Sequence, residues 1–233
     1  MKKRNKRIAL IVSLVFVVAL SVSFTAAYLT AQTDTVTNTF TATTSLIKAD
    51  GAFTLTETKN YKMGTEGFEL DGVAKTNTGV NYTGVLPGMK IAKDPMVSID
   101  LATAGHIFLK VESTNMTAED DYANDGDLYN WTIANGWELV EKTASGNGKT
   151  YYLYVMRNVS GVDGEGRLVT TNIPVLEGNQ VEVANYDVED ADLAEQGASL
   201  KFSAYAIQVF GVDVSDEAKA LDVFTDNFGN YNA

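Results

Sequence analysis

Few residues of this chain could carry out chemistry that is recognisable from sequence. The chain has 233 residues, with one histidine, His106, and no cysteine. A Ser-His-Asp triad would have to use His106, but no G-x-S-x-G motif accompanies it, and a single histidine excludes an H-E-x-x-H zinc site. The lack of cysteine excludes thiolate nucleophiles, thiolate metal sites and disulfides. We therefore expect no enzyme and no cofactor, although a glycosidase-type carboxylate pair stays open because 30 acidic residues offer many pairs.

One acidic stretch imitates a calcium-binding loop. Residues 121–127, DYANDGD, follow the start of an EF-hand loop, whose first, third and fifth positions supply oxygen ligands. Ala123 stands at the third position and Thr132 at the twelfth, where a bidentate glutamate is required, so the EF-hand motif fails. A looser calcium site here or at residues 187–192 is one interpretation, and solvated acidic loops are the other. The calcium candidates are Asp121, Asp125 and Asp127.

Aromatic residues gather in two runs, one with Trp131 and Trp137 and the other with Tyr151, Tyr152 and Tyr154. On the surface they would form a platform for a carbohydrate or a peptide. Strands favour aromatic side chains simply because these fill a pleated surface, and we favour this packing role.

The N-terminal sequence predicts that the protein is exported from the cell. Basic residues crowd positions 1–7, an apolar run covers residues 8–22, and small residues follow at Thr25, Ala26 and Ala27. This order is typical of a secretory signal, with Thr25 and Ala27 at the −3 and −1 positions of a cut before Tyr28. Residues 1–27 are thus a predicted signal peptide of a protein that is secreted to the extracellular matrix or the cell surface. The competing interpretation is an uncleaved membrane anchor, because residues 8–27 match the roughly 20 residues of a membrane-spanning helix.

The mature chain would be strongly acidic. Five of the 18 lysines and arginines lie in residues 1–7, so removal of the signal lowers the formal net charge from −12 to −17. Such a charge repels nucleic acid and anionic lipid. We therefore expect no nucleic-acid partner, and contact with a membrane only through an uncleaved signal.

The remaining chain, residues 46–233, predicts one all-β domain. Short β-favourable runs recur between turn signals at residues 52–58, 96–101, 106–113, 129–133, 137–143, 150–159, 167–175, 179–188 and 200–210. Ile107, Leu109 and Val111 alternate with His106 and Phe108, which indicates a strand with one apolar face. Many short strands of this kind predict an antiparallel β-sandwich of the jelly-roll type.

Turn and helix signals are sparser. Asn147-Gly148 is a strong signal for the turn of a β-hairpin. Residues 215–224, SDEAKALDVF, predict a short helix, with Ser215 as its N-cap and acidic residues in its first turn. Residues 184–197 predict either a second short helix or an acidic loop.

Residues 28–45 have a period-two pattern of their own. Threonine occupies every odd position from Thr33 to Thr43, which predicts a strand. After cleavage this strand has a free end, so it can pair with its own sandwich or add to the open sheet edge of another molecule. In the second case Val36, Phe40 and Leu46 fill alternate pockets of the neighbour, the threonine face stays outward, and the contact repeats into a filament. The candidate polymerisation strand comprises Val36, Asn38, Phe40 and Ala42.

Three blocks carry a family resemblance: AAYLTAQTDTVTNTFTA at residues 26–42, VLPGMKIAKDPMVSI at 85–99 and FSAYAIQVFGVDVSDEAKAL at 202–221. They resemble, in order, the signal junction, the Pro-Gly turn with its Lys-Asp-Pro segment, and the closing strand and short helix of the TasA and camelysin (CalY) family. These are exported fibre proteins of the biofilm matrix of Gram-positive bacteria. The resemblance implies cleavage by a SipW-type signal peptidase, a jelly-roll core, and fibre assembly through the freed N-terminal strand.

Sequence and resemblance together predict a secreted structural subunit that works by donor-strand complementation and without catalysis. Its partners would be further copies of itself in a head-to-tail homopolymer, the signal peptidase and other matrix proteins. Camelysin-type members have been described as proteases, but one histidine and no zinc motif give no ground for carrying that activity over. Two alternatives stay open: a monomeric surface module that binds a glycan or a host protein, and an exported hydrolase.

Overall fold

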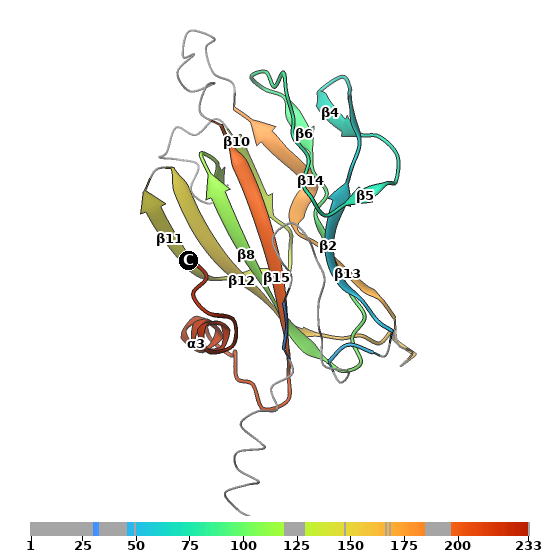
Figure 1. The fold of residues 1–233 in the computed structure, drawn as a ribbon, viewed down its shortest axis with the longest axis vertical. Helices are drawn as coiled ribbons and strands as arrows, with labels where there is room; N and C mark the ends of the chain where they lie inside the picture. Colours follow the sequence, from blue (N-terminus) through green and yellow to red (C-terminus); the bar gives the residue numbers. More distant parts are fainter. Residues whose placement is uncertain are drawn as a thin grey trace, which may run out of the picture.

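A computed structural model describes residues 30–32, 46–48, 50–118, 129–146, 148–165, 167, 169–184 and 197–232 of the chain. Within these residues the chain is built from strands and one helix, and most strand pairs are antiparallel (Figure 1). The predicted all-β class is therefore confirmed. The jelly-roll arrangement stays a prediction.

The first sheet has five strands, and all of its pairs are antiparallel. Its order is β1 (Thr30–Gln32), β15 (Ser199–Gln208), β8 (Gly105–Thr114), β12 (Lys149–Val159) and β11 (Glu138–Gly146). β11 and β12 form a hairpin in which Gly146 pairs with Lys149, on either side of the predicted Asn147-Gly148 turn.

Two further sheets complete the sandwich. One has six strands in the order β3 (Tyr61–Met63), β4 (Gly67–Leu70), β6 (Lys90–Ala92), β14 (Leu176–Val183), β10 (Tyr129–Ile133) and β9 (Thr117–Ala118). The other has four, in the order β13 (Thr171–Pro174), β7 (Met96–Ile99), β2 (Phe53–Thr58) and β5 (Lys75–Thr76). Every strand predicted between residues 52 and 210 is therefore present, and most have shifted ends.

One hydrophobic core joins the three sheets. It takes Leu109 and Phe202 from the first sheet, Trp131 and Val181 from the six-stranded sheet, and Ile99 from the four-stranded sheet. Leu46 is 0% exposed and belongs to this same core. The expectation that Leu46 fills a pocket of a neighbouring molecule is therefore wrong.

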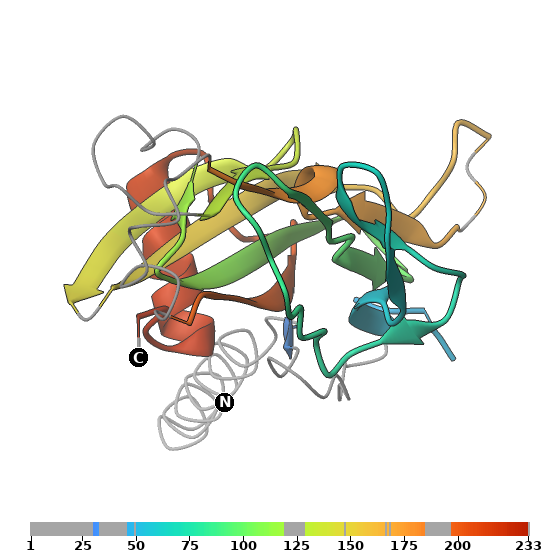
Figure 2. The same cartoon turned by 90° about the horizontal axis from the view of Figure 1, so that it is seen from above.

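The first sheet is covered on both of its faces. Leu109 of β8 points into the core between the sheets, whereas Phe108 packs in a second cluster against the helix α3 (Glu217–Phe228). Phe224 of α3 is 1% exposed, and its ring centroid lies 5.5 Å from that of Phe108. Figure 2 shows α3 on the outer face of this sheet. The prediction of one apolar face is therefore wrong for β8, because a third layer buries the other face.

The helix begins at a different cap from the one predicted. Asp216, not Ser215, is the N-cap, and its side chain accepts a hydrogen bond from the backbone N–H of Lys219 at 3.0 Å. Ser215 instead donates its own backbone N–H to Asp213 and accepts a bond from the Lys219 ammonium. The Asp216 side chain, one residue after the predicted cap Ser215, accepts the N–H of the third residue of the helix, which is the usual capping geometry.

Replacing Asp216 by alanine should lower the free energy of unfolding by about 1 kcal/mol, because an N–H of the first turn loses its acceptor. Ser215→Ala is the matched control, and it should change that free energy by less than about 0.5 kcal/mol, since it removes only an exposed hydroxyl. Urea unfolding followed by circular dichroism measures both. Equal losses would show that Asp216 is not the cap.

Two predictions concern residues that the structure does not describe. These are the signal peptide, residues 1–27, and the second helix, of which residues 185–196 are not described. In the described part of the chain, no helix is long and apolar enough to cross a membrane.

Candidate functional site

Within the described residues, β15 is paired along the outer edge of the first sheet at one end only. β1 pairs with it through Thr30 and Ile207, Ala31 and Ala206, and Gln32 and Tyr205. Among the described residues no strand pairs with residues 199–203 on this side of β15. A strand edge can accept another strand, and residues 199–203 are the part of β15 at which the described residues supply none.

The backbone groups of this edge point outward at alternate residues. Val209, just beyond β15, donates its backbone N–H to the oxygen of Ala104, on the β8 side. In an antiparallel ladder the backbone groups of successive residues point to opposite sides of the strand. Leu200 and Phe202 therefore direct their N–H and C=O groups away from β8, toward the uncovered side.

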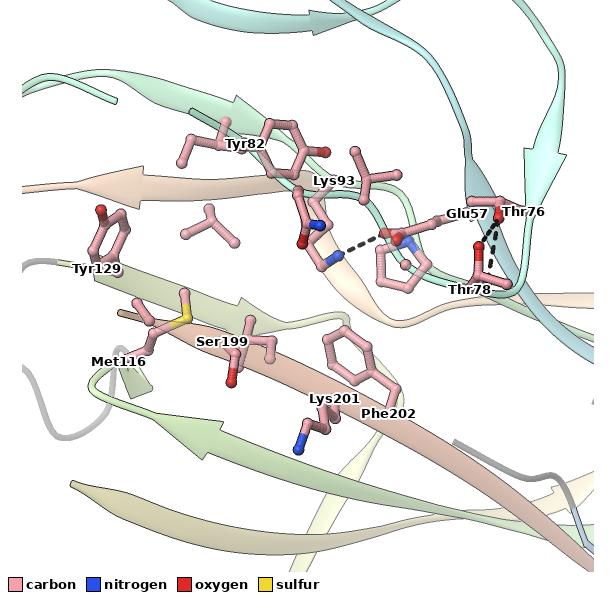
Figure 3. A pocket seen from close by; sticks show the side chains of 18 of the residues that line it. Glu57, Thr76, Thr78, Tyr82, Lys93, Met116, Tyr129, Ser199, Lys201 and Phe202 are labelled. Carbon is pink, nitrogen blue, oxygen red and sulfur yellow. Dashed lines mark hydrogen bonds and ion pairs between the residues drawn. The ribbon is translucent and has the colours of Figure 1, made fainter. Parts of the chain in front are cut away.

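A cavity of about 660 Å³ lies along the same stretch of β15. Residues 197–202 form one wall, and the opposite wall consists of residues 55–57 of β2 and residues 76–82 with Lys93 (Figure 3). Figure 3 shows Phe202 projecting from β15 toward Glu57, and Lys201 projecting to the other side of the strand. The apolar part of the lining includes Leu55, Ile91, Val181 and Leu200.

A buried ion pair stands in the wall opposite β15. The Lys93 Nζ lies 2.6 Å from Glu57 Oε2, and their side chains are 12% and 9% exposed. Tyr82 beside them donates its hydroxyl to the Ala92 oxygen at 2.8 Å. Burial, together with the charges of Glu57 and Asp94, raises the pKa of Tyr82 far above its usual value, so this hydroxyl stays a neutral donor.

A second polar cluster fixes the neighbouring strands. Asp94 accepts hydrogen bonds from the backbone N–H of Thr58 at 2.6 Å, from the Thr58 hydroxyl at 2.8 Å and from the Lys75 ammonium at 2.6 Å. Burial alone would raise the pKa of Asp94, but the bonds from Lys75 and Thr58 hold it below its usual value. Asp94 thereby ties β2 and β5 to the start of β7, and so fixes the shape of the cavity wall.

No sequence motif pointed to Glu57, Tyr82 or Lys93 as site residues. A signal was present for Glu57, because Phe53, Leu55 and Glu57 occupy alternate positions of β2 and all three are buried. A charged residue in the inward register of a strand indicates a buried partner. The identity of that partner, 36 residues further along the chain, depends on the fold.

His106 and the aromatic residues considered as a binding platform are buried inside the fold. His106 is 3% exposed, and its Nδ1 accepts a hydrogen bond from the backbone N–H of Asn158 at 3.3 Å. Burial, reinforced by the nearby charge of Arg157, lowers the pKa of His106, so the ring is a neutral acceptor. The aromatic residues proposed as an alternative surface platform are all buried, which confirms the packing interpretation: Trp131, Trp137, Tyr151, Tyr152 and Tyr154.

The other predicted site residues lie outside the described part of the chain. They are the cut-site residues Thr25, Ala27 and Tyr28, the polymerisation residues Val36, Asn38, Phe40 and Ala42, and the calcium candidates Asp121, Asp125 and Asp127. The described residues contain no group of three or more acidic or histidine side chains that could hold a metal ion.

Comparison with known proteins found no match. No protein-family model, no curated protein and no solved structure is similar to this chain. The features that bear on function are therefore the edge of β15 and the cavity beside it.

Proposed function

We propose that this protein is a secreted structural subunit of an extracellular fibre, and that it polymerises when the N-terminal strand of one copy adds to β15 of the next. The observation that carries the proposal is the edge of β15, with which, among the described residues, only β1 pairs, at residues 205–207, and beside which an apolar-lined cavity lies. Strand addition needs these two parts together: a row of backbone groups for affinity and recesses for alternate side chains.

The donated strand is the segment with Val36, Asn38, Phe40 and Ala42, freed when a signal peptidase cuts between Ala27 and Tyr28. Donor and acceptor are different surfaces of the same molecule, so each bound copy offers a new acceptor. Contacts of this head-to-tail kind do not close on themselves, and they produce a filament. The fibre belongs to a biofilm matrix or a cell surface, where other matrix proteins are its further partners.

The test compares two purified chains, one beginning at Tyr28 and one at Thr41. Both retain the strands from β2 to β15 and the helix, whereas the shorter chain lacks β1 and most of the predicted donor strand. We expect filaments from the longer chain and monomers from the shorter, by negative-stain electron microscopy and size-exclusion chromatography. Salt should be raised in both, because it screens the repulsion between acidic subunits.

Thermal unfolding of the shorter chain is the control, because a chain that failed to fold would be monomeric for a trivial reason. Monomers from both folded chains would contradict the fibre proposal. They would favour the alternative of a monomeric binding module, since a cavity of about 660 Å³ lies within the range of roughly 300–1,000 Å³ usual for small ligands such as a short glycan.

A further inference from the structure

The connection from β15 to α3 carries an exposed aromatic side chain. Phe210 is 88% exposed, whereas the other phenylalanines that the structure describes are buried or half-buried. Phenylalanine is among the residues most often found fully buried in folded proteins. Single apolar residues on a surface are common, so the exposure of Phe210 gains meaning only from its place in the molecule.

Hydrogen bonds hold the backbone around Phe210 in a tight turn. Val212 donates its backbone N–H to the Val209 oxygen at 3.2 Å, and the Gln208 side chain donates to the Phe210 oxygen at 3.1 Å. Gly211 has a φ of 77°, the left-handed conformation that the third position of a type II turn requires. The fold therefore fixes the backbone of this turn while it leaves the ring at its second position in solvent.

The described N-terminal strand begins at this same end of the first sheet. Thr30, the first residue of β1, pairs with Ile207, three residues before Phe210. Because β1 and β15 are antiparallel, the N-terminal end of β1 lies at the end of the sheet where β15 runs into the turn. Figure 1 shows the connection from β15 to α3 at the lower end of the molecule, below α3.

The predicted signal ends only a few residues before Thr30. Residues 8–27 match the roughly 20 residues that span the hydrocarbon of a bilayer. The three residues from Ala27 to Thr30 reach at most about 10–11 Å when fully extended. While the signal is uncleaved, a spanning segment would therefore hold Thr30 within that distance of the hydrocarbon. Phe210 belongs to the end of the domain that would then face the membrane.

The charges beside the turn favour a neutral lipid surface over an anionic one. The Lys219 ammonium lies 2.8 Å from Asp213 and 3.5 Å from Asp216. One ammonium offsets only part of the charge of two carboxylates, so anionic head groups would repel this end of the domain.

We propose that, before the signal is cleaved, Phe210 inserts its ring among the head groups of the membrane and holds the domain against the lipid surface. One apolar group alone is a marginal membrane anchor, and stable attachment takes two signals. The uncleaved segment supplies one and the Phe210 ring the other, so cleavage also releases the turn. The inference rests on the predicted signal of the proposed function and adds a lipid surface as a transient partner.

Quenching of tryptophan fluorescence by lipid tests the contact. The full chain with Phe210→Trp is reconstituted into phosphatidylcholine vesicles that are brominated near the head-group end of their acyl chains, since bromine quenches indoles that reach the bilayer. Val73→Trp is the matched control, because Val73 is 90% exposed and lies between β4 and β5, away from the connection to α3 (Figure 1). The unsubstituted chain gives the background of Trp131 and Trp137, which are buried. We expect Phe210→Trp to lose most of its added fluorescence and Val73→Trp to lose none.

Removal of the signal provides a second comparison. A chain that begins at Tyr28 and carries Phe210→Trp should show no quenching with the same vesicles, because the ring alone is a marginal anchor. Equal quenching with and without residues 1–27 would overturn the dependence on the signal.

The outcomes also separate this inference from the fibre proposal. Equal quenching of the Phe210→Trp and Val73→Trp chains would overturn the contact, as would quenching of neither in a chain that floats with the vesicles. An emission shift of Phe210→Trp that follows protein concentration and not lipid would assign the turn to a contact between copies, against the inference. A full chain that does not float with the vesicles would contradict the predicted signal and the contact together. Filaments of the chain that begins at Tyr28 test the fibre independently of all these results.

Discussion

Replacing Lys93 by methionine should lower the free energy of unfolding by about 3–5 kcal/mol, because it leaves the carboxylate of Glu57 buried without its partner. The two side chains are 12% and 9% exposed, and their charged atoms lie 2.6 Å apart. Methionine retains most of the length and apolar volume of lysine. The lower free energy of unfolding therefore comes from the missing charge and not from a cavity. Urea unfolding at neutral pH measures it.

The double variant Glu57→Met with Lys93→Met shows whether the loss comes from the unpaired charge. Replacing both members of a buried pair by apolar side chains of similar size is often neutral in its effect on stability. We therefore expect the double variant to regain most of what Lys93→Met loses. A double variant as unstable as the single one would mean that Lys93 acts by packing alone.

A solvent-exposed ion pair serves as the comparison for the buried pair of Lys93 and Glu57. Lys90 and Glu66 lie 3.4 Å apart, with side chains that are 48% and 75% exposed. Because water already solvates both charges, Lys90→Met should cost less than about 1 kcal/mol. A loss as large as that of Lys93→Met would show that burial is not what distinguishes the two pairs.

The longer strands were predictable because they follow from local sequence, whereas the short strands β3, β4, β5, β6 and β9 were not predicted. β10 (Tyr129–Ile133) coincides with its predicted run residue for residue, and β2, β8 and β12 begin within one residue of theirs. Alternation of side chains between two faces is a property of one strand, and turn residues bound it on either side. Neither requires knowledge of what packs against the strand.

The number of layers was not predictable in the same way. Alternation shows that His106 and Phe108 share a face of β8, but it does not say what covers that face. Phe108 was the available signal, because phenylalanine is among the residues that are most often fully buried. The cover comes from α3, more than 100 residues away in the chain.

The acceptor cavity is also a product of the tertiary fold. Its walls come from β15 and from residues 55–57, 76–82 and 93, which the chain brings together across more than 100 positions. The N-terminal donor strand, by contrast, is a prediction from the period of two in residues 33–43. The sequence therefore indicates which strand we propose to be donated, whereas the fold is needed to find the edge and the recess that we propose receive it.

Replacing Phe224 by alanine should lower the free energy of unfolding by about 3–5 kcal/mol, since it removes a fully buried aromatic ring. Phe224 is 1% exposed, and its ring lies 5.5 Å from that of Phe108 and 5.0 Å from that of Tyr205. Thr225→Ala, at the next and exposed position of α3, should stay within about 0.5 kcal/mol of the parent chain. Thermal and urea unfolding measure both variants.

The same variant tests whether stability and assembly use separate faces of the first sheet. Phe224 packs on the outer face with α3, whereas Leu200 and Phe202 meet the cavity on the inner side of β15. Well below its lowered unfolding midpoint, Phe224→Ala should therefore form filaments at the critical concentration of the parent chain. Val36→Asp should show the reverse, with a parental midpoint and no filaments at that concentration. A Phe224→Ala chain that stays folded but fails to polymerise would place α3 in the contact between subunits and contradict an acceptor confined to the β15 edge.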